Sequence, residues 1–304
     1  MSHSPRVPCS LLLLALGLAC RRDALAPQPN AAAGLRFSQS SPPPPDPLAP
    51  PGHIVFVRIL PPLDREVFRM DATGANVTQL HAGYAPAPSP DGTKIAFNCG
   101  ANICVMNADG SGLVQLTANV LAESPAWSPD GSHLAFDEQD PAGKSHIYAM
   151  NADGSGVVQL TTGTANDAAP DWSPDGTKIA FVRNLSGTPQ VLVMNADGSN
   201  VVQLTSSSGG SRNPAWSPSG GLIAFDSNRS GTSQIYLMNS DGTGVAQVTT
   251  TGGSDPDWSL DASRLVFTCP AGKSSDICAI GPDGSRAVNL TNTRVAENSP
   301  AWGP

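Results

Sequence analysis

A phrase of seven residues returns through the chain at a nearly constant interval. Its fullest copy is Pro170-Asp171-Trp172-Ser173-Pro174-Asp175-Gly176, and all five tryptophans lie in copies of it, 45, 44, 42 and 44 residues apart. A sixth copy, at 86–92, has proline in place of the tryptophan. Repetition with a period of about 40 to 45 residues is typical of blade repeats, in which each unit packs only on its neighbours. The chain is therefore expected to be a closed or stacked array of similar units.

Each unit contains four short apolar segments separated by turn residues. Around Trp172 these segments are 169–172, 178–182, 190–194 and 201–204. Segments rich in Val, Ile, Phe and Leu between Ser-Pro-Asp-Gly and Asn-Ala-Asp-Gly turns predict four β-strands per unit. A methionine precedes the second turn in most units and is predicted to be a core residue between sheets, since Met fills irregular apolar gaps.

Counting the units predicts an all-β fold, a six-bladed β-propeller of four-stranded blades. Second-strand segments begin near Ile54, Lys94, His133, Lys178, Leu222 and Arg264. The propeller, residues 53–304, would start with a second strand (His53–Val57) and end with a first strand (Ser299–Trp302). The C-terminal strand is therefore predicted to pair with the N-terminal blade, which closes the ring and removes its open edges.

The first twenty residues predict an export signal. Arg6 precedes an apolar run, Leu11–Ala19, that is too short to span a bilayer and ends at Cys20. The residues before Cys20 resemble the signal of bacterial lipoproteins, and the resemblance implies lipidation of Cys20. Simple cleavage of the signal is the alternative.

Residues 21–52 are rich in proline and almost free of large apolar side chains. Such a segment cannot bury enough surface to fold, so a disordered linker is predicted. A ligand for a proline-binding domain is the alternative to a passive spacer.

Four cysteines occupy matching places in two units. Cys99 and Cys104 lie after the second and within the third strand segment of one unit, and Cys269 and Cys278 do so in another. We predict Cys99–Cys104 and Cys269–Cys278 disulfides, which are typical of an oxidising compartment outside the cytoplasm. Half of a metal site at Cys99 and Cys104 is the alternative, but no histidine or further cysteine pair accompanies either hairpin. No metal and no cofactor is predicted.

The charge balance excludes one class of partner. The net charge is −8 and only 14% of the residues are charged, whereas binding to nucleic acid or to an anionic membrane surface needs clustered Lys and Arg. We expect no nucleic acid partner, no membrane contact other than the lipid anchor, and a monomer.

The residues at the start of each first strand are the candidate ligand-binding site. First strands line the channel of a propeller, and the residues just before them form one mouth. These positions are polar and differ between units, unlike the turn phrases. The candidates are Tyr84, Glu123, Asp167, Asp171, Arg212, Asn213, Asp255, Asp257 and Glu297. A wet mouth that is polar without any ligand is the alternative, and Ca²⁺ held by the carboxylates is a further one.

No catalytic motif is present. The sequence has no nucleophile elbow, no His-Glu-x-x-His helix and no phosphate loop, and its five histidines are scattered. A non-catalytic protein is expected. The alternative is a carbohydrate-active hydrolase or lyase outside the cytoplasm that uses carboxylates in the channel, because paired acids suffice for some glycoside chemistry.

The repeated phrases resemble the WD-like propeller repeats of the TolB family. The shared pattern is Trp-Ser-Pro-Asp-Gly, a strand like Lys178-Ile179-Ala180-Phe181, then Met-Asn-Ala-Asp-Gly and Gln203-Leu204-Thr205. The resemblance covers residues 53–304 and implies a six-bladed propeller in the periplasm that binds envelope proteins, including a peptidoglycan-associated lipoprotein.

TolB has an α/β domain before the propeller, and here the signal and the proline-rich segment take that position, so a role in the Tol complex is not implied. We expect an exported, lipid-anchored protein of the periplasm or cell surface that binds an envelope protein or polymer through its channel mouth and loops.

Overall fold

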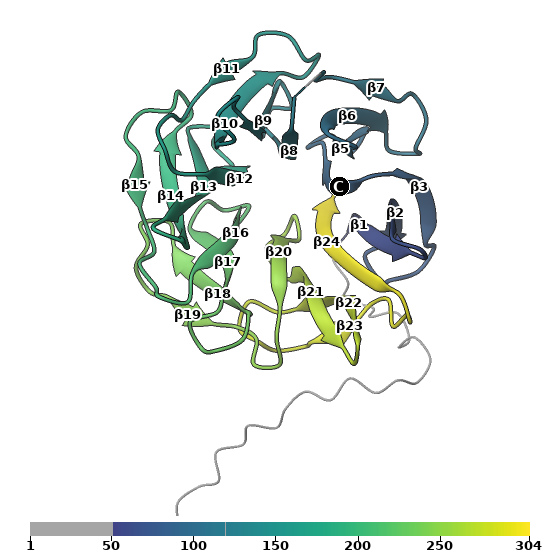
Figure 1. Ribbon diagram of the computed structural model, residues 1–304. Coiled ribbons are helices and arrows are strands. Elements are labelled where there is room, and N and C mark those ends of the chain that lie inside the picture. The colour runs from purple at the N-terminus through teal and green to yellow at the C-terminus, as the bar shows by residue number, and fades with distance from the viewer. Residues whose placement is uncertain (1–50, 119) are drawn as a thin grey trace, which may run out of the picture. The chain divides into compact units, whose positions relative to one another are not determined.

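The computed structural model describes residues 51–118 and 120–304. In these residues twenty-four strands form six four-stranded antiparallel sheets, which are arranged as blades in a ring around a common centre (Figure 1). The export signal, Cys20 and nearly all of the predicted linker lie outside the described residues. No helix within the described residues is long and apolar enough to cross a membrane.

The blades are lettered A to F around the ring, and their strands are given from the channel outward. Blade A contains β24 (Ala296–Gly303), β1 (His53–Leu60), β2 (Asp64–Asp71) and β3 (Thr78–Ala82). Blade B contains β4 (Tyr84–Pro88), β5 (Lys94–Cys99), β6 (Asn102–Asn107) and β7 (Val114–Gln115). Blade C contains β8 (Ala122–Trp127), β9 (His133–Gln139), β10 (Ser145–Asn151) and β11 (Val158–Gln159).

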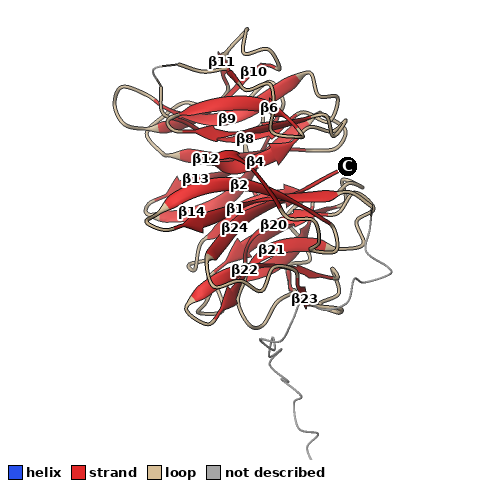
Figure 2. Ribbon diagram, turned by 90° about the vertical axis from the view of Figure 1, so that its right-hand side faces the viewer, coloured by secondary structure: helices blue, strands red, loops and turns tan. Residues whose placement is uncertain are grey.

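The other three blades follow the same order of strands. Blade D contains β12 (Asp167–Trp172), β13 (Lys178–Leu185), β14 (Thr188–Asn195) and β15 (Val202–Gln203). Blade E contains β16 (Ser211–Trp216), β17 (Leu222–Ser227), β18 (Gln234–Asn239) and β19 (Ala246–Gln247). Blade F contains β20 (Ser254–Trp258), β21 (Leu265–Ala271), β22 (Ser274–Ile280) and β23 (Val288–Asn289). Figure 2 shows the same blades from the side.

The predicted closure of the ring is confirmed. Strand β24 pairs antiparallel with β1, with Trp302 opposite Ile54 and Gly303 opposite His53. The imidazole Nδ1 of His53 lies 2.6 Å from the Pro304 carbonyl oxygen. Blade A is therefore built from both ends of the described chain.

The core lies between neighbouring blades and repeats with them. Each second strand contributes a phenylalanine, and those of blades A to E are fully buried. The methionines before the second turn are also buried, with at most 1% of their surface exposed, so the prediction of a packing role is confirmed. Burial of one such side chain stabilises the fold by about 1.5 to 3 kcal/mol.

The Gln-Leu-Thr phrase has a structural explanation. In blade D the hydroxyl of Thr205 accepts the backbone N–H of Val191 at 2.9 Å, and the side chain of Gln203 donates to the Thr205 carbonyl at 2.6 Å. The same hydroxyl contact recurs in blades B, C, E and F. The threonine thus fixes the two-residue fourth strand to the third, because a buried N–H is costly to leave without an acceptor.

Both predicted disulfides are present. Cys99–Cys104 joins β5 to β6 and Cys269–Cys278 joins β21 to β22. These hairpins belong to blades B and F, the two neighbours of the closing blade A in the ring. Two disulfides within hairpins are typical of proteins that fold outside the cytoplasm.

The glycine of each Asn-Ala-Asp-Gly turn touches the preceding blade. Gly198 has φ +85°, and a Cβ atom added to it would lie 2.5 Å from the Leu160 carbonyl oxygen of blade C. Gly187, in the same blade, has φ +88° but nothing within 4 Å of its added Cβ. The two glycines therefore share a backbone conformation and differ in their surroundings.

We expect Gly198→Ala to destabilise the protein more than Gly187→Ala. Both substitutions place a side chain in the left-handed region, at a cost of about 1 to 3 kcal/mol. Only Gly198→Ala adds a collision with backbone, which should raise its cost by about a further 1 to 3 kcal/mol. Urea unfolding of the two variants measures the difference. Equal loss of stability would contradict a close contact between blades C and D at this turn.

Candidate functional site

The innermost strand of every blade carries the same backbone irregularity. Its pairing register shifts at an X-Pro pair, and residue X has φ between 48° and 54°. The six X residues are Ala85, Ser124, Ala169, Asn213, Asp255 and Ser299. Non-glycine residues rarely adopt this conformation, and each costs about 1 to 3 kcal/mol. The irregularity is a bulge that bends the strand at the channel.

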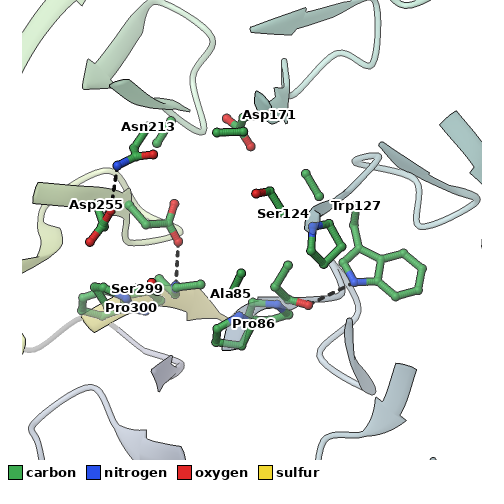
Figure 3. A pocket seen from close by; sticks show the side chains of 18 of the residues that line it. Ala85, Pro86, Ser124, Trp127, Asp171, Asn213, Asp255, Ser299 and Pro300 are labelled. Atoms are coloured by element: carbon green, nitrogen blue, oxygen red, sulfur yellow. Dashed lines mark hydrogen bonds between the residues drawn. The ribbon is translucent and has the colours of Figure 1, made fainter. Parts of the chain in front are cut away.

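These six X-Pro pairs line a cavity of about 390 Å³ in the channel (Figure 3). Proline and alanine form much of its wall. Its ionisable side chains are Asp171, Asp255 and Asp257, and no Lys, Arg or His side chain of the described residues lines it. The lining continues past the ends of the innermost strands to Pro90 and Pro304. The cavity therefore extends from the bulges toward the face that carries the Ser-Pro-Asp-Gly turns.

Asp171 and Asp257 connect neighbouring blades across the wall of this cavity. Asp171 in blade D accepts the backbone N–H of Trp216 in blade E at 2.7 Å. Asp257 in blade F accepts the N–H of Trp302 in blade A, also at 2.7 Å. The alanine found at this position in other blades cannot make such a bond. Both aspartates thus combine a structural bond with a place on the cavity wall.

The pKa values of these two carboxyls differ. Burial raises the pKa of Asp171 to about 8, and the negative charge of Asp257 adds to this rise. Burial raises the pKa of Asp257 to about 6, against the N–H bonds that stabilise its charged form. Near pH 7 Asp257 is therefore mostly ionised and Asp171 mostly protonated.

A second polar group lies between blades E and F. The side chain of Asn213 donates to Asp255 at 2.7 Å and to Asp226 at 2.8 Å, and Figure 3 shows Asn213 turned toward Asp255. Thr268 donates to the other oxygen of Asp255 at 3.1 Å. Burial, followed by the charge of Asp255, raises the pKa of Asp226 to about 7.

Asp226 was not predicted from the sequence, and it has a counterpart in blade C. It follows the buried phenylalanine of β17, where Asp137 follows that of β9 and Asn98 that of β5. Asp137 accepts the N–H of Ala169, the bulge residue of the next blade, at 3.3 Å. Asn98 accepts the N–H of Ser124 in the same way at 3.0 Å. Aligning the second strands would have revealed these polar residues within otherwise apolar segments.

Two predicted site residues are held in buried ion pairs instead. Asp167 accepts two bonds from Arg183, at 2.6 and 2.7 Å, and Glu297 accepts from Arg58 at 2.6 and 2.7 Å. Both acids are fully buried and neither lines the cavity. Each arginine stands directly opposite its acid on the second strand. From the sequence, both acids are expected at the mouth of the channel. In the structure each acid instead holds the first strand of its blade to the second, in blades D and A.

Three further predicted residues lie outside the cavity lining. Tyr84 donates its hydroxyl to Glu123 at 2.9 Å, and burial together with this bond raises the pKa of Tyr84 to about 12. Arg212 is exposed at the start of β16. The structure therefore brings together four of the nine candidates at the cavity, namely Asp171, Asn213, Asp255 and Asp257.

No group of three or more His, Cys, Asp or Glu side chains in residues 51–118 and 120–304 is placed to hold a metal ion. Three carboxyls line the cavity, but each is bonded to a different protein group. The calcium alternative therefore lacks a ligand cluster in the described part of the chain.

Fold and site together define the class of the molecule as a closed six-bladed β-propeller with a central cavity. It is similar to TolB propellers: residues 164–304 match the family model described as TolB beta propeller domain. TolB from Acinetobacter baumannii is similar with a TM-score of 0.75 and 21% identity, over 83% of this chain and 67% of that one.

Two other solved structures are informative. A putative TolB from Agrobacterium tumefaciens has a TM-score of 0.67 and 21% identity, over 84% of this chain and 99% of that one. An oligogalacturonate lyase from Vibrio parahaemolyticus has a TM-score of 0.54 and 16% identity, over 75% and 71%. No curated protein matches the sequence. The predicted resemblance and the six-bladed fold are thus confirmed, while these identities speak for the fold alone.

Proposed function

We propose that this protein is a binding module that works outside the cytoplasm and receives part of an envelope protein or polymer in its central channel. The observation that carries the proposal is the cavity of about 390 Å³, to which all six blades contribute and in which carboxyls meet no cation. Concave sites with a few convergent polar groups are the usual places for ligands. The exposed residues Glu123 and Arg212, with the partly buried Tyr84, would serve at the opposite rim.

The charge of the cavity selects the ligand group. Asp257, with a pKa of about 6, supplies negative charge at neutral pH, whereas burial raises the pKa of Asp255. The wall otherwise consists largely of proline and alanine, and the whole chain carries a net charge of −8. A lysine or arginine side chain, or an amino group of a polymer, would complement this lining. A bound cation would also favour ionisation of Asp171, so binding should release protons below pH 8.

The disulfides and the N-terminal sequence support the proposed location. Two disulfides in described hairpins agree with export. Cys20, at the end of the predicted signal, would carry the lipid that holds the module, as a monomer, at a membrane facing the periplasm or the cell surface. The proline-rich residues 21–52 would be the tether between the lipid and blade A.

An enzyme acting on carbohydrate is the alternative, and one observation favours it. Asp171 with a pKa of about 8 and Asp257 with a pKa of about 6 offer a proton donor and a base near neutrality. Both carboxyls, however, already accept N–H groups of the neighbouring blades. An acidic cavity also repels anionic sugars such as oligogalacturonate. Incubation with neutral, basic and acidic oligosaccharides tests this alternative, and any cleavage lost in Asp171→Asn would support it.

The binding proposal predicts the behaviour of an Asp255→Asn/Asp257→Asn variant. It should capture at least about tenfold less partner from an envelope extract than the wild type does. Removal of paired buried charges costs about 2 kcal/mol or more of binding free energy. Asp257 accepts the N–H groups of Trp258 and Trp302 on its two oxygens, and asparagine can still accept one of them, so circular dichroism should first verify that the variant is folded. Mass spectrometry of captured material measures the loss.

The matched control is Asp241→Asn, which removes one exposed charge from the Asn-Ser-Asp-Gly turn of blade E. Its captured partners should equal those of the wild type. The same partners in the same amounts with the channel variant would rule out the cavity as the binding site.

A further inference from the structure

A second concave site lies between blades C and D, away from the lining of the channel. This groove encloses about 690 Å³, more than the channel cavity. Blade C contributes residues of β9, β10 and β11, and blade D contributes the end of β12 and two turns, blades that are neighbours in the ring (Figure 1). It lies at the edge of the core that the two blades share.

The floor of the groove is apolar. Met150, Leu160 and Trp172 form it, and Val158 continues it outward. Val158 belongs to the short outer strand β11 and has 57% of its surface exposed. Covering an apolar surface of this kind with another apolar side chain is favourable, because both surfaces are removed from water.

The rim of the groove is negatively charged. Asp130, Asp175 and Asp197 lie along it, and within residues 51–118 and 120–304 no Lys or Arg side chain contributes to the lining. Each carboxylate is fixed by donors of its own turn: Asp130 by Ser128 at 2.6 Å, Asp175 by Ser173 at 2.6 Å and Asp197 by the N–H of Ser199 at 2.9 Å.

These hydrogen bonds hold the pKa of all three rim carboxyls below the usual range. The rim is therefore ionised and immobile at neutral pH, so it presents its charge without a cost of reordering.

The corresponding groove between blades B and C differs in charge and size. It encloses about 410 Å³ and Lys94 lies in its lining, beside Asp91 and Asp130. In the groove between C and D the equivalent strand position is occupied by His133. The lysine that offsets part of the negative charge of the first groove is thus replaced by a histidine in the second.

The tryptophan of this groove also differs from two of its counterparts. Trp127 and Trp258 donate their indole N–H to a carbonyl of the preceding blade, each at 3.1 Å. The indole nitrogen of Trp172 is buried and has no acceptor among the described residues, and the same holds for Trp216 in blade E. The tryptophans of blades D and E therefore lack the interblade bond that those of blades C and F make.

We propose that the groove between blades C and D binds an extended peptide segment of a partner in which a lysine or arginine stands next to a large apolar side chain. The apolar side chain would cover Leu160, Trp172 and Val158, and the cation would lie between Asp130, Asp175 and Asp197. Charge complementarity selects this occupant, since an acidic or purely polar segment would meet three fixed carboxylates and gain nothing from the floor.

A labelled synthetic hexapeptide of alternating lysine and leucine is the probe. Titration of the full protein should show saturable binding that weakens as salt is raised, because the rim charges are exposed to solvent. A hexapeptide of alternating glutamate and leucine should not bind. Equal binding of the two peptides would show that the groove is a non-specific apolar surface, and it would overturn the proposal.

Two pairs of variants locate the site. Asp130→Asn/Asp175→Asn/Asp197→Asn should lower the affinity for the lysine–leucine peptide by at least about fivefold, because three exposed charge pairs are lost. Asp109→Asn/Asp241→Asn/Asp283→Asn removes the same charge from equivalent turns outside the groove and should have a much smaller effect. Val158→Ser should weaken binding, whereas Val202→Ser, at the same place in blade D with 56% exposure, should not.

The channel variant separates this site from the proposed function. Asp255→Asn/Asp257→Asn should leave the peptide affinity unchanged. If that variant abolishes binding while the groove variants do not, the peptide occupies the channel and the groove proposal is wrong. Equal losses from the groove triple and its control would show general attraction to an acidic protein, which also overturns it.

Discussion

A chain that stops at Val295, and so lacks β24, is expected to lose cooperative folding. Strand β24 is the innermost strand of blade A, and it pairs with β1 from Ala296 to Gly303. Its loss removes the buried Trp302 and opens the channel-side edge of β1, which invites aggregation. It also removes the acceptor-bound N–H that links Asp257 to blade A. Circular dichroism and size-exclusion chromatography should show a destabilised or aggregated protein.

A circular permutant is the control for this truncation. His53 lies in contact with Pro304, so a short linker can join the two ends. New ends can be placed at Gly163, in the connection between blades C and D, where an added Cβ would meet nothing within 4 Å. This chain keeps every blade intact and should fold with nearly native stability. A truncated chain as stable as the permutant would show that the closing strand is dispensable.

The sequence predicts this closure because each blade repeats the same local signals. Turn phrases, strand lengths and the buried methionine before each Asn-Ala-Asp-Gly turn agree from unit to unit, so counting alone sets the number of blades and the offset of the last strand. The disulfides follow for the same reason, because Cys99 and Cys104 occupy the positions of Cys269 and Cys278. Local and global preferences coincide here.

The site is less predictable because it depends on side-chain direction. The bulge at each X-Pro pair shifts the register of the innermost strand. Only the structure shows that Asn213 and Asp255 then line the cavity and that Tyr84 lies outside it. Whether an acid is free depends on its cross-strand neighbour: Asp167 faces Arg183 and is neutralised. A pattern of polar residues before the strands could not distinguish these cases.

The other prediction with a large expected effect concerns the buried Asp137. Burial raises its pKa from the ordinary value of 3.8 to about 7. Between these two values the folded state binds more protons than the unfolded chain, so stability falls as pH rises through this window and stays low above it. The difference corresponds to about 4 kcal/mol as an upper limit. Asp226, with a pKa raised to about 7, should contribute with the same sign.

Asp137→Asn is expected to make the protein more stable at pH 8 by up to a few kcal/mol, and to leave stability at pH 4 nearly unchanged. Blade B shows that asparagine fits this place, because Asn98 accepts the N–H of Ser124 at 3.0 Å and donates to the Ala122 carbonyl at 2.6 Å. The amide would keep the bond to Ala169 without a buried charge. Urea unfolding at pH 4, 6 and 8 measures the effect.

The control is Asp130→Asn, because the contribution of Asp130 to stability depends on pH with the opposite sign. Asp130 lies at the surface, and bonds from Ser128 and Ser132 lower its pKa, so its contribution is present at neutral pH and is lost as pH falls through the acid range. Asp130→Asn should therefore give no gain at pH 8. If Asp137→Asn changes stability equally at pH 4 and pH 8, the carboxyl of Asp137 is ionised in the fold at both values, and the buried acids between the blades do not make the propeller sensitive to pH.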